Sequence, residues 1–402
     1  MTHSARTSVW LRGILQPVGK ATLVPVTPSV LTWAVKESGY EPDTVAAKAG
    51  VSPQTFAAWL RGDEHPKLSQ FRKLANTLKR TPATLLLPEP PRRPAAAVEF
   101  RRAPGAERTD LLPTERRYLR EARRLQDLVR WLQSELGDEV SPLPHFHTDL
   151  EPEAVSRRLR AFFPPPNGDS GVRTPAQAFR WWRSALERRG VLVFGFPLGR
   201  HGIHGFSLPH ETAPVVAFNT WWRNEVRSFT LFHEFGHLLT RTASACLEAR
   251  RRFARPSDSI ERWCEQFSAT LLLPREEVQK FLTEDLGRPA TLRVEELDVP
   301  SRMASRFKVS LRAATLRLIE MKLATWDLYA QIPPVSENKP RGGGGRGRER
   351  GEIREGQYGD RTVSLMVRAL NRDVLGRTDV LDALNIADTD LSKLERKSAR
   401  TA

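Results

Sequence analysis

The chain has 402 residues, of which 40% are hydrophobic, and carries a formal net charge of +16 at pH 7. This length suits two or three domains, and the positive charge favours an acidic partner, most commonly nucleic acid, unless the excess arginine only solvates the surface. The two cysteines, Cys246 and Cys264, exclude a disulfide framework, and the absence of an 18-residue apolar run excludes a membrane span, so we expect a soluble, cytoplasmic protein.

Changes in composition along the chain predict its organisation. The runs PEPPRRPAAA and KPRGGGGRGRER are rich in proline or glycine and favour extended or flexible linkers. We expect a mainly α protein with a small β-sheet (α+β). The predicted parts are an N-terminal arm (1–27), a compact helical domain (28–88), a Pro/Arg-rich linker (89–112), a central domain (113–335), a Gly/Arg-rich linker (336–359) and a small helical C-terminal region (360–402).

The first compact unit carries the pattern of a helix-turn-helix. Gly50 supplies the turn, because a left-handed backbone there needs a residue without Cβ. Ser52 is expected to cap the next helix, and Pro53 takes its first turn. The residues of this second helix predicted to face a major groove are Gln54, Thr55, Ala58 and Arg61.

The same unit resembles a known family of DNA-binding domains. The stretch AAKAGVSPQTFAAWLRG, followed by PKLSQFRKLANTL, is similar to the XRE or Cro-type repressor domains. The resemblance implies that the N-terminal domain binds DNA. The alternative is a helical docking module that binds no DNA.

A long helix is predicted over TERRYLREARRLQDLVRWLQSELG. Its apolar residues alternate in steps of four and three, as they do in a coiled coil. The stripe consists of Tyr118, Ala122, Leu125, Val129, Leu132 and Leu136. It predicts either the seam of a homodimer or a helix packed on its own domain.

A helix and three strands are expected next. FRWWRSALERRG has a helical pattern and is closed by Gly190, whereas VLVFGFP, GIHGFSL and PVVAFN are rich in β-branched and aromatic residues. Near the end of the chain, Gly376 is expected to stop one helix, and Thr378 is expected to cap another.

The stretch SFTLFHEFGHLLT predicts a metal site on an apolar, buried helix. His233 and His237 are four residues apart, so both imidazoles lie on one helix face and can hold one ion. Glu234 follows the first histidine, the arrangement in which a glutamate acts as general base. In the next predicted helix, ERWCEQFSATLLLP, Glu261 can supply a third ligand. Two histidines and one glutamate leave a fourth position for water, as catalytic zinc requires.

Residues 175–330 resemble the ImmA/IrrE family of zinc metallo-endopeptidases. The similar pieces include WWRSALERRGVLVFGFPL, RSFTLFHEFGHLL and IERWCEQFSATLLLP. The resemblance implies a zincin-like central domain that holds one zinc ion through His233, His237 and Glu261, with Glu234 as base. Glu265 occupies the position where the family usually has a short polar residue that orients a metal ligand without itself binding the metal. The implied substrate is a partner regulator, commonly a repressor or antitoxin-like protein.

Hydrolysis of a peptide bond also needs a place for the substrate and a donor for the oxyanion. An extended peptide can add to an exposed strand, for which GIHGFSL and PVVAFN are candidates. His201 and His204 are candidate donors, although the alternative is that both are surface histidines. The helical pair SRFKVSLRAATLRLIEMKL is expected to pack inside the central domain, rather than form a second DNA-binding helix-turn-helix.

These patterns leave two classes of function open. The first is a DNA-associated regulatory metallo-endopeptidase. The second is a DNA-binding transcriptional regulator or antitoxin whose zinc fold is structural or sensory. Because a general base serves no purpose in a structural zinc site, Glu234 favours the enzyme.

Overall fold

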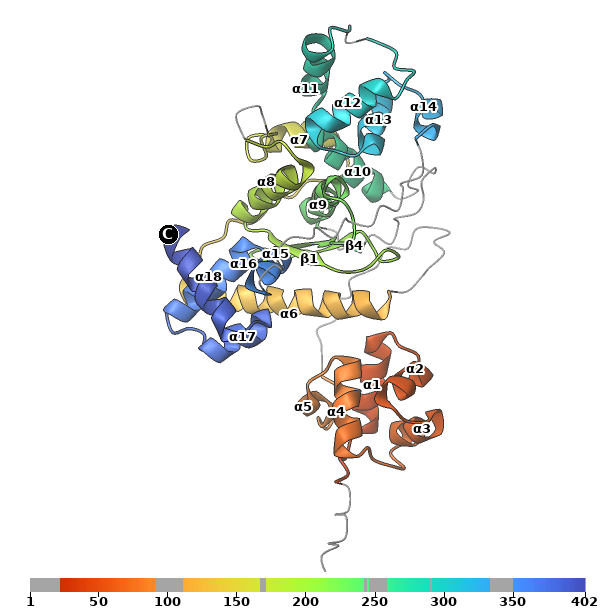
Figure 1. The fold of residues 1–402 in the computed structure, drawn as a ribbon, viewed down its shortest axis with the longest axis vertical. Helices are drawn as coiled ribbons and strands as arrows, with labels where there is room; N and C mark the ends of the chain where they lie inside the picture. The colour runs from red at the N-terminus through yellow and green to blue at the C-terminus, as the bar shows by residue number, and fades with distance from the viewer. Residues whose placement is uncertain are drawn as a thin grey trace, which may run out of the picture. The chain divides into compact units, whose positions relative to one another are not determined.

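The computed structural model describes residues 22–91, 111–166, 171–241, 244–245, 259–289, 291–332 and 350–401. The chain divides into two compact units, residues 1–96 and 97–402. The fold of the described residues is mainly α-helical with one small β-sheet, as the sequence predicts (Figure 1). Most of the predicted arm and of both linkers lies outside the described residues. None of the described helices is long and apolar enough to cross a membrane.

The N-terminal unit is built from five helices among its described residues. They are α1 (Pro28–Ser38), α2 (Pro42–Ala49), α3 (Pro53–Arg61), α4 (Leu68–Leu78) and α5 (Pro82–Leu85). The turn between α2 and α3 has the predicted local structure. Gly50 adopts a left-handed conformation with φ of 76°, and the backbone N–H of Thr55 donates to the Ser52 hydroxyl at 3.1 Å. Phe56 and Trp59 of α3 are buried in the core, and Val51 and Leu60 pack against it.

The sheet of the second unit contains the three predicted strands and one short addition. Its strands are β1 (Leu192–Phe196), β2 (Gly205–Leu208), β3 (Val215–Asn219) and β4 (Ser244–Ala245), in the order β1-β3-β2-β4. β1 pairs in parallel with β3, and β2 runs antiparallel to both β3 and β4. β3 is therefore an interior strand, with neighbours on both sides.

The side chains of the sheet alternate between two hydrophobic cores because successive residues of a strand point to opposite faces. Val193, Val216 and Phe218 belong to the first core, while Phe194 and Ala217 belong to the second. Every residue of β1, β2 and β3 is buried, so helices cover both faces.

Helices from the middle of the chain build the first core. They are α7 (Pro152–Leu159), α8 (Pro175–Arg188), α9 (Asn224–Leu239), α10 (Ser259–Leu272), α11 (Arg275–Lys280), a π-helical turn (Phe281–Asp285), α12 (Asp298–Phe307), α13 (Leu311–Glu320) and α14 (Trp326–Ala330). Of these, α8 and α9 pack on the strands themselves, α9 directly on β2 and β3, and α10 packs on α9 (Figure 1). This arrangement places the helix with the paired histidines against the centre of the sheet.

The second core, on the other face of the sheet, is built with α6 (Pro113–Leu136) and helices from the C-terminal region. The C-terminal helices are α15 (Arg350–Tyr358), α16 (Asp360–Asn371), α17 (Arg377–Leu384) and α18 (Asp388–Thr401). Of the helices in this core, α6 and α15 contact the strands. The apolar stripe of α6 is buried with them in the second core, and Leu125, Val129 and Leu132 have no exposed surface. The stripe therefore packs within the chain, as the second of the two interpretations expected, and is not presented to another copy.

The C-terminal region corrects one local prediction. Gly376 does not stop a helix but is the N-cap residue of α17, and its N–H donates to the Asp379 carboxylate at 3.0 Å. Thr378 lies inside α17, whereas the preceding helix, α16, ends at Asn371. The physical reason is that glycine serves at a helix N-cap with extended backbone as well as after a helix end.

Candidate functional site

The close crossing of α9 and α10 creates the candidate metal centre. Gly236 of α9 lies against Cys264 of α10, where a Cβ on the glycine would be 3.1 Å from the cysteine Sγ. Cys264 is itself fully buried. Because Gly236 has no side chain, the two helices approach closely enough for Glu261 to reach the histidines of α9. Gly236 and Cys264 thus set the distance between the two halves of the site.

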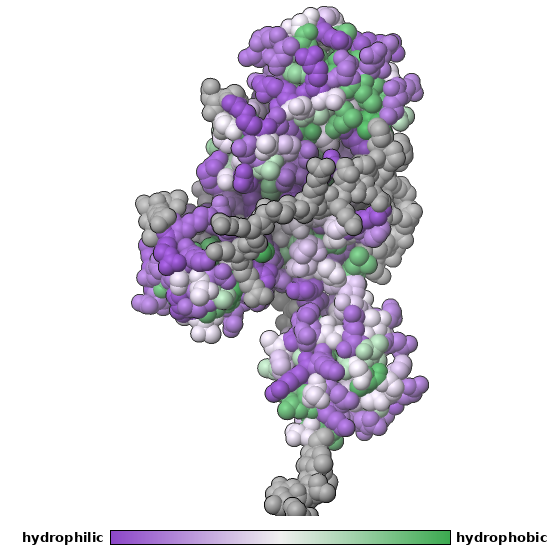
Figure 2. Space-filling view, in the orientation of Figure 1, coloured by the Kyte–Doolittle hydropathy of each residue, from purple (hydrophilic) through white to green (hydrophobic). Residues whose placement is uncertain are grey.

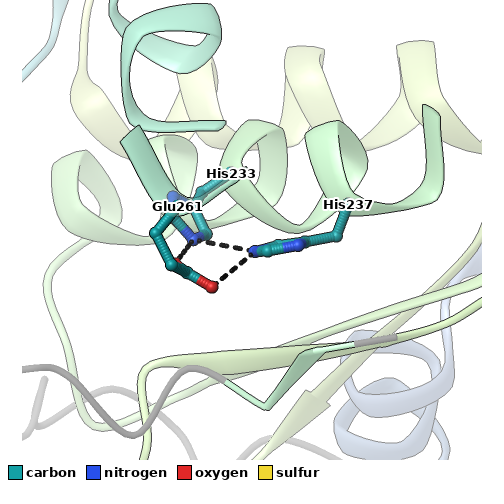
Figure 3. A group of neighbouring side chains, drawn as sticks. All are labelled: His233, His237 and Glu261. Carbon is teal, nitrogen blue, oxygen red and sulfur yellow. Dashed lines mark hydrogen bonds and ion pairs between the residues drawn. The ribbon is translucent and has the colours of Figure 1, made fainter. Parts of the chain in front are cut away.

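The three predicted ligands converge at one point (Figure 3). The Nε2 atoms of His233 and His237 are 3.3 Å apart. The two carboxylate oxygens of Glu261 lie 3.2 Å from His233 Nε2 and 3.3 Å from His237 Nε2. His233 and His237 are buried, and Glu261 is half-buried, so the cluster lies inside the fold with one side accessible.

The donor set suits a zinc ion. Zinc in proteins takes imidazole nitrogens and carboxylate oxygens at about 2.0–2.1 Å in tetrahedral geometry, which separates neighbouring ligand atoms by about 3.3–3.4 Å. The observed separations of 3.2–3.3 Å match this requirement. Within the described residues, His233, His237 and Glu261 are the group of potential ligands close enough to hold a metal ion.

The electrostatics of the cluster favour a positive charge at the same point. Burial lowers the pKa of His233, but the hydrogen bond and charge of Glu261, with the charges of Glu234 and Glu265, outweigh burial and raise it to about 9. Burial raises the pKa of Glu261, but the two histidines outweigh it and hold the pKa well below its usual range. The same carboxylates that stabilise a proton on the His233 imidazole would also stabilise a metal ion bound there.

Glu234 lies beside the cluster on α9 and is fully buried. Strand β2 passes close to it because Gly205 has no side chain: a Cβ there would lie 2.6 Å from Thr230 Cγ2 and 3.1 Å from Glu234 Cγ. Glu234 is therefore enclosed between the helix and the strand, at the position that follows His233. Glu234 does not belong to the group of residues whose ligand atoms lie within 4.8 Å of one another.

Glu265 lies one helical turn after Glu261 on α10 and is exposed. Its carboxylate is one of the charges that raise the pKa of His233. The structure therefore places Glu265 near the site, on the solvent side.

A loop pair at the end of the sheet brings His204 and Trp222 together near the site. Their rings are 4.3 Å apart. Burial and the charge of His233 lower the pKa of His204 to about 4, so its imidazole is neutral at pH 7. The Nε2 atom of His204 is buried and has no hydrogen-bond partner among the described residues. His201, the other candidate donor, is exposed.

Asn219, which the sequence did not single out as a site residue, holds these loops. The side-chain amide of Asn219, at the end of β3, donates to the carbonyls of Gly199 and Ile203, and its oxygen accepts the N–H groups of Leu198 and Trp221. The sequence feature that could have indicated Asn219 is its position as the polar residue that ends the apolar run PVVAFN.

The sheet order corrects the prediction for substrate binding by strand addition. PVVAFN forms β3, which is paired on both sides and cannot accept another strand. GIHGFSL forms β2, whose second edge is paired with β4 at Phe206 and Ser207. Among the described strands, the unpaired edges therefore belong to β1 and β4.

The predicted DNA-contacting residues of α3 do not all face outward. Gln54 and Arg61 are exposed, and Thr55 is half-buried beside Ser52. The prediction that Ala58 faces outward is wrong, because it is only 8% exposed and packs into the N-terminal unit. Arg61 pairs with Asp63 at 2.7 Å, although both side chains are more than half exposed.

The helical pair α12–α13 packs inside the second unit, as expected. Met303, Ala314 and Leu318 belong to the same core as α9 and α10. Arg317 of α13 is buried and donates to the carbonyl of Leu273 at 2.9 Å, just after α10. α13 therefore packs against α10 in the core and is not an exposed DNA-binding helix.

Residues 186–318 match a peptidase family model, M78, described as the IrrE N-terminal-like domain. No curated protein matches the chain. The matched range runs from the end of α8 to α13 and contains both helices of the candidate metal centre. This region is therefore similar to a metallopeptidase domain, and the match supports the ImmA/IrrE family for it.

Proposed function

We propose that the protein is a DNA-associated zinc metallo-endopeptidase that cuts a partner regulator, such as a repressor or an antitoxin-like protein. The observation that carries the catalytic part is the triangle of His233, His237 and Glu261, whose ligand atoms have tetrahedral spacing, beside the buried Glu234. The match to the IrrE N-terminal-like domain supports the reaction class.

Each residue of the site has a role in hydrolysis. His233, His237 and Glu261 would hold the zinc ion. When bound there, zinc would lower the pKa of a water molecule and polarise the scissile carbonyl. Glu234 accepts the proton of the attacking water and delivers it to the leaving nitrogen. The enclosure of Glu234 beneath β2 restricts its side chain, which keeps the carboxylate in place for both proton transfers.

His204 is the candidate donor to the oxyanion of the tetrahedral intermediate. It is neutral at pH 7 and so retains one ring N–H to donate, and its buried Nε2 has no partner among the described residues. Asn219 fixes the loop that precedes it through Ile203.

The N-terminal unit would bind DNA through α3 and the cations around it. Gln54 and Arg61 are exposed on α3. The Nζ atom of Lys73 lies beside the turn, 3.6 Å from the position of a Cβ on Gly50. Such a lysine can reach a phosphate while α3 faces the major groove.

The catalytic proposal is tested with the variant Glu234→Gln, which keeps the size of the side chain but removes the base. Candidate repressors are incubated with each zinc-loaded protein, and cleavage is followed by mass spectrometry. We expect the variant to cut about 10²–10⁴-fold more slowly than the wild type, with unchanged zinc content.

Equal cleavage by both proteins would contradict the assigned base. If neither zinc-loaded protein cuts any partner, the alternative of a DNA-binding regulator with a sensory or structural zinc fold replaces the enzyme.

A further inference from the structure

The C-terminal helices repeat the local structure of the N-terminal helix-turn-helix. α2 and α17 each have eight residues, and each is followed by a three-residue turn, Gly50–Ser52 or Asn385–Ala387. The first residue of each turn is left-handed, with φ of 76° and 51°. Asparagine is the residue other than glycine that adopts this conformation most readily.

The hydrogen bonds of the two turns also correspond. The N–H of Val51 donates to the carbonyl of Ala46 at 3.0 Å, and the N–H of Ile386 donates to that of Leu381 at 3.1 Å. In both cases the next helix begins at the third position after the left-handed residue.

The buried residues follow the same register over three helices, α1–α3 and α16–α18. A residue of α1–α3 and its counterpart in α16–α18 are separated by the same number of positions as Gly50 and Asn385, so the two stretches align without an insertion or deletion. The corresponding buried pairs are Val30 and Leu365, Leu31 and Met366, Ala34 and Ala369, Val45 and Val380, Ala49 and Leu384, Phe56 and Leu391, and Trp59 and Leu394. An isolated hydrogen-bonded turn is common at helix ends, but a register shared across three helices supports a repeated unit.

The outer face of α18 carries positive charge. Thr389, Lys393 and Arg396 are exposed at helical spacing, and they correspond to Gln54, Ala58 and Arg61 of α3. Residues of these C-terminal helices are largely hydrophilic on the face seen in Figure 2. Where Ala58 is buried in the N-terminal unit, α18 presents an exposed lysine.

Two acidic residues at the start of α18 are engaged within the unit. Asp388 pairs with Arg377 at 2.5 Å, and Asp390 accepts the backbone N–H of Ala387 at 3.4 Å. Both acids are thus engaged within the C-terminal helices, while Lys393 and Arg396 lie at exposed positions of α18. A cationic face on the third helix of such a unit is complementary to the phosphates that border a DNA groove.

We propose that α16–α18 form a second helix-turn-helix unit and that α18 binds duplex DNA through Thr389, Lys393 and Arg396. This goes beyond the function proposed above, which assigns DNA binding to the N-terminal unit alone. The two units would give one chain two contacts with DNA.

The test uses the full-length protein and a fluorescent duplex of random sequence, with affinity measured over a range of salt concentrations. The double variant Lys393→Glu/Arg396→Glu removes both cations of α18. Its matched control, Lys280→Glu/Arg293→Glu, makes the same change of charge at exposed positions of the peptidase domain. A third protein carries Arg61→Glu in the N-terminal unit. Circular dichroism and thermal unfolding check that each protein folds.

We expect the α18 variant to bind at least about tenfold more weakly than the control, with a salt slope smaller by about 2, because each phosphate contact contributes about 0.9. The milder pair Lys393→Gln/Arg396→Gln should shift both values in the same direction. Binding equal to that of the control would overturn the proposal. Loss of binding only to a protein partner, with the DNA affinity unchanged, would also overturn it.

The N-terminal variant separates this proposal from the earlier one. If Arg61→Glu weakens binding and the α18 variant does not, the second unit fails while the N-terminal role stands. If only the α18 variant weakens binding, the second unit stands and the N-terminal role fails. A wild-type protein that binds no duplex contradicts both, and the cleavage assay still tests the peptidase separately.

Discussion

His233 shows how single residues prepare this site for a cation. The carboxylates of Glu261, Glu234 and Glu265 all favour a positive charge on its imidazole, and together they outweigh the burial that opposes it. In the metal-free protein a proton supplies that charge. A metal ion supplies it when the site is loaded, so proton and metal compete for the same nitrogen.

The raised pKa predicts how the stability of the metal-free protein depends on pH. The folded-state pKa of His233, about 9, lies above its ordinary value of 6.5. Its contribution is therefore complete below pH 6.5 and is lost as the pH rises through 9. The loss is on the order of 3 kcal/mol in the free energy of unfolding. Urea unfolding in the presence of a chelator, at intervals from pH 6 to 9.5, measures it.

The variant His233→Gln is the control for this pH dependence, since it has no titrating imidazole at the position. We expect its stability to change less than that of the wild type over the same range. Parallel curves for the two proteins would show that the ion pair with Glu261 does not hold the proton.

At the scale of elements, the geometry of the site depends on the contact between α9 and α10. A Cβ added to Gly236 would lie 3.1 Å from the Sγ atom of Cys264. The variant Gly236→Val should push the helices apart and lower the free energy of unfolding by about 1–3 kcal/mol. It should also weaken zinc binding, because Glu261 moves away from the histidines. Chemical unfolding and zinc titration measure the two effects.

Cys264→Ala, added to Gly236→Val, makes room for the new side chain and should recover part of both losses. A helical glycine with open space around it, Gly356, is the matched control, and Gly356→Val should leave zinc affinity unchanged. Strict additivity of the two substitutions at the crossing would show that this contact does not set the distance between the helices.

Most elements could be predicted from the sequence because their patterns are local. The strands of VLVFGFP and PVVAFN, the long amphipathic α6 and the helix with His233 and His237 all form where expected. Strand order is not local, so the interior position of β3 could not be predicted, nor could the choice between a dimer seam and internal packing for α6. Ala58 was misplaced because a helix face was assigned without knowing which neighbours cover it.

The residues of the site that lie in local motifs could be predicted from the sequence as well. His233, Glu234 and His237 lie within one helical motif, and Glu261 adds a polar residue at the start of the next helix. The loop contacts of Asn219 and the packing of His204 on Trp222 join separate loops, so the sequence marked these residues only as a polar strand end and a candidate donor and did not predict their contacts.

At the scale of the whole molecule, the net charge of +16 agrees with the proposed binding of DNA, an acidic partner. Lys73, beside the turn of the N-terminal unit, should contact a phosphate. The variant Lys73→Gln should therefore lower the salt slope of DNA binding by about 1 and weaken binding to all sequences equally. Fluorescence anisotropy on several duplexes measures this, with Lys36→Gln on α1 as the control.

A salt slope that stays the same in Lys73→Gln and in the control would contradict the proposed contact between Lys73 and a phosphate.

The repeated unit at the C-terminus could not be recognised from the sequence, because Asn385 and Ala387 replace the glycine and serine that mark the turn at Gly50 and Ser52. The backbone of the turn and the shared register of buried residues reveal it.

The central claim is that His233, His237 and Glu261 hold one zinc ion, and the metal content of the purified protein tests it most directly. Inductively coupled plasma mass spectrometry should find about one zinc per wild-type chain after dialysis, and much less in His237→Ala and Glu261→Gln. His65→Ala, at an exposed histidine of the N-terminal unit, is the control and should retain the metal. A wild-type protein that stays metal-free after exposure to zinc, or variants that keep the full amount, would contradict the account.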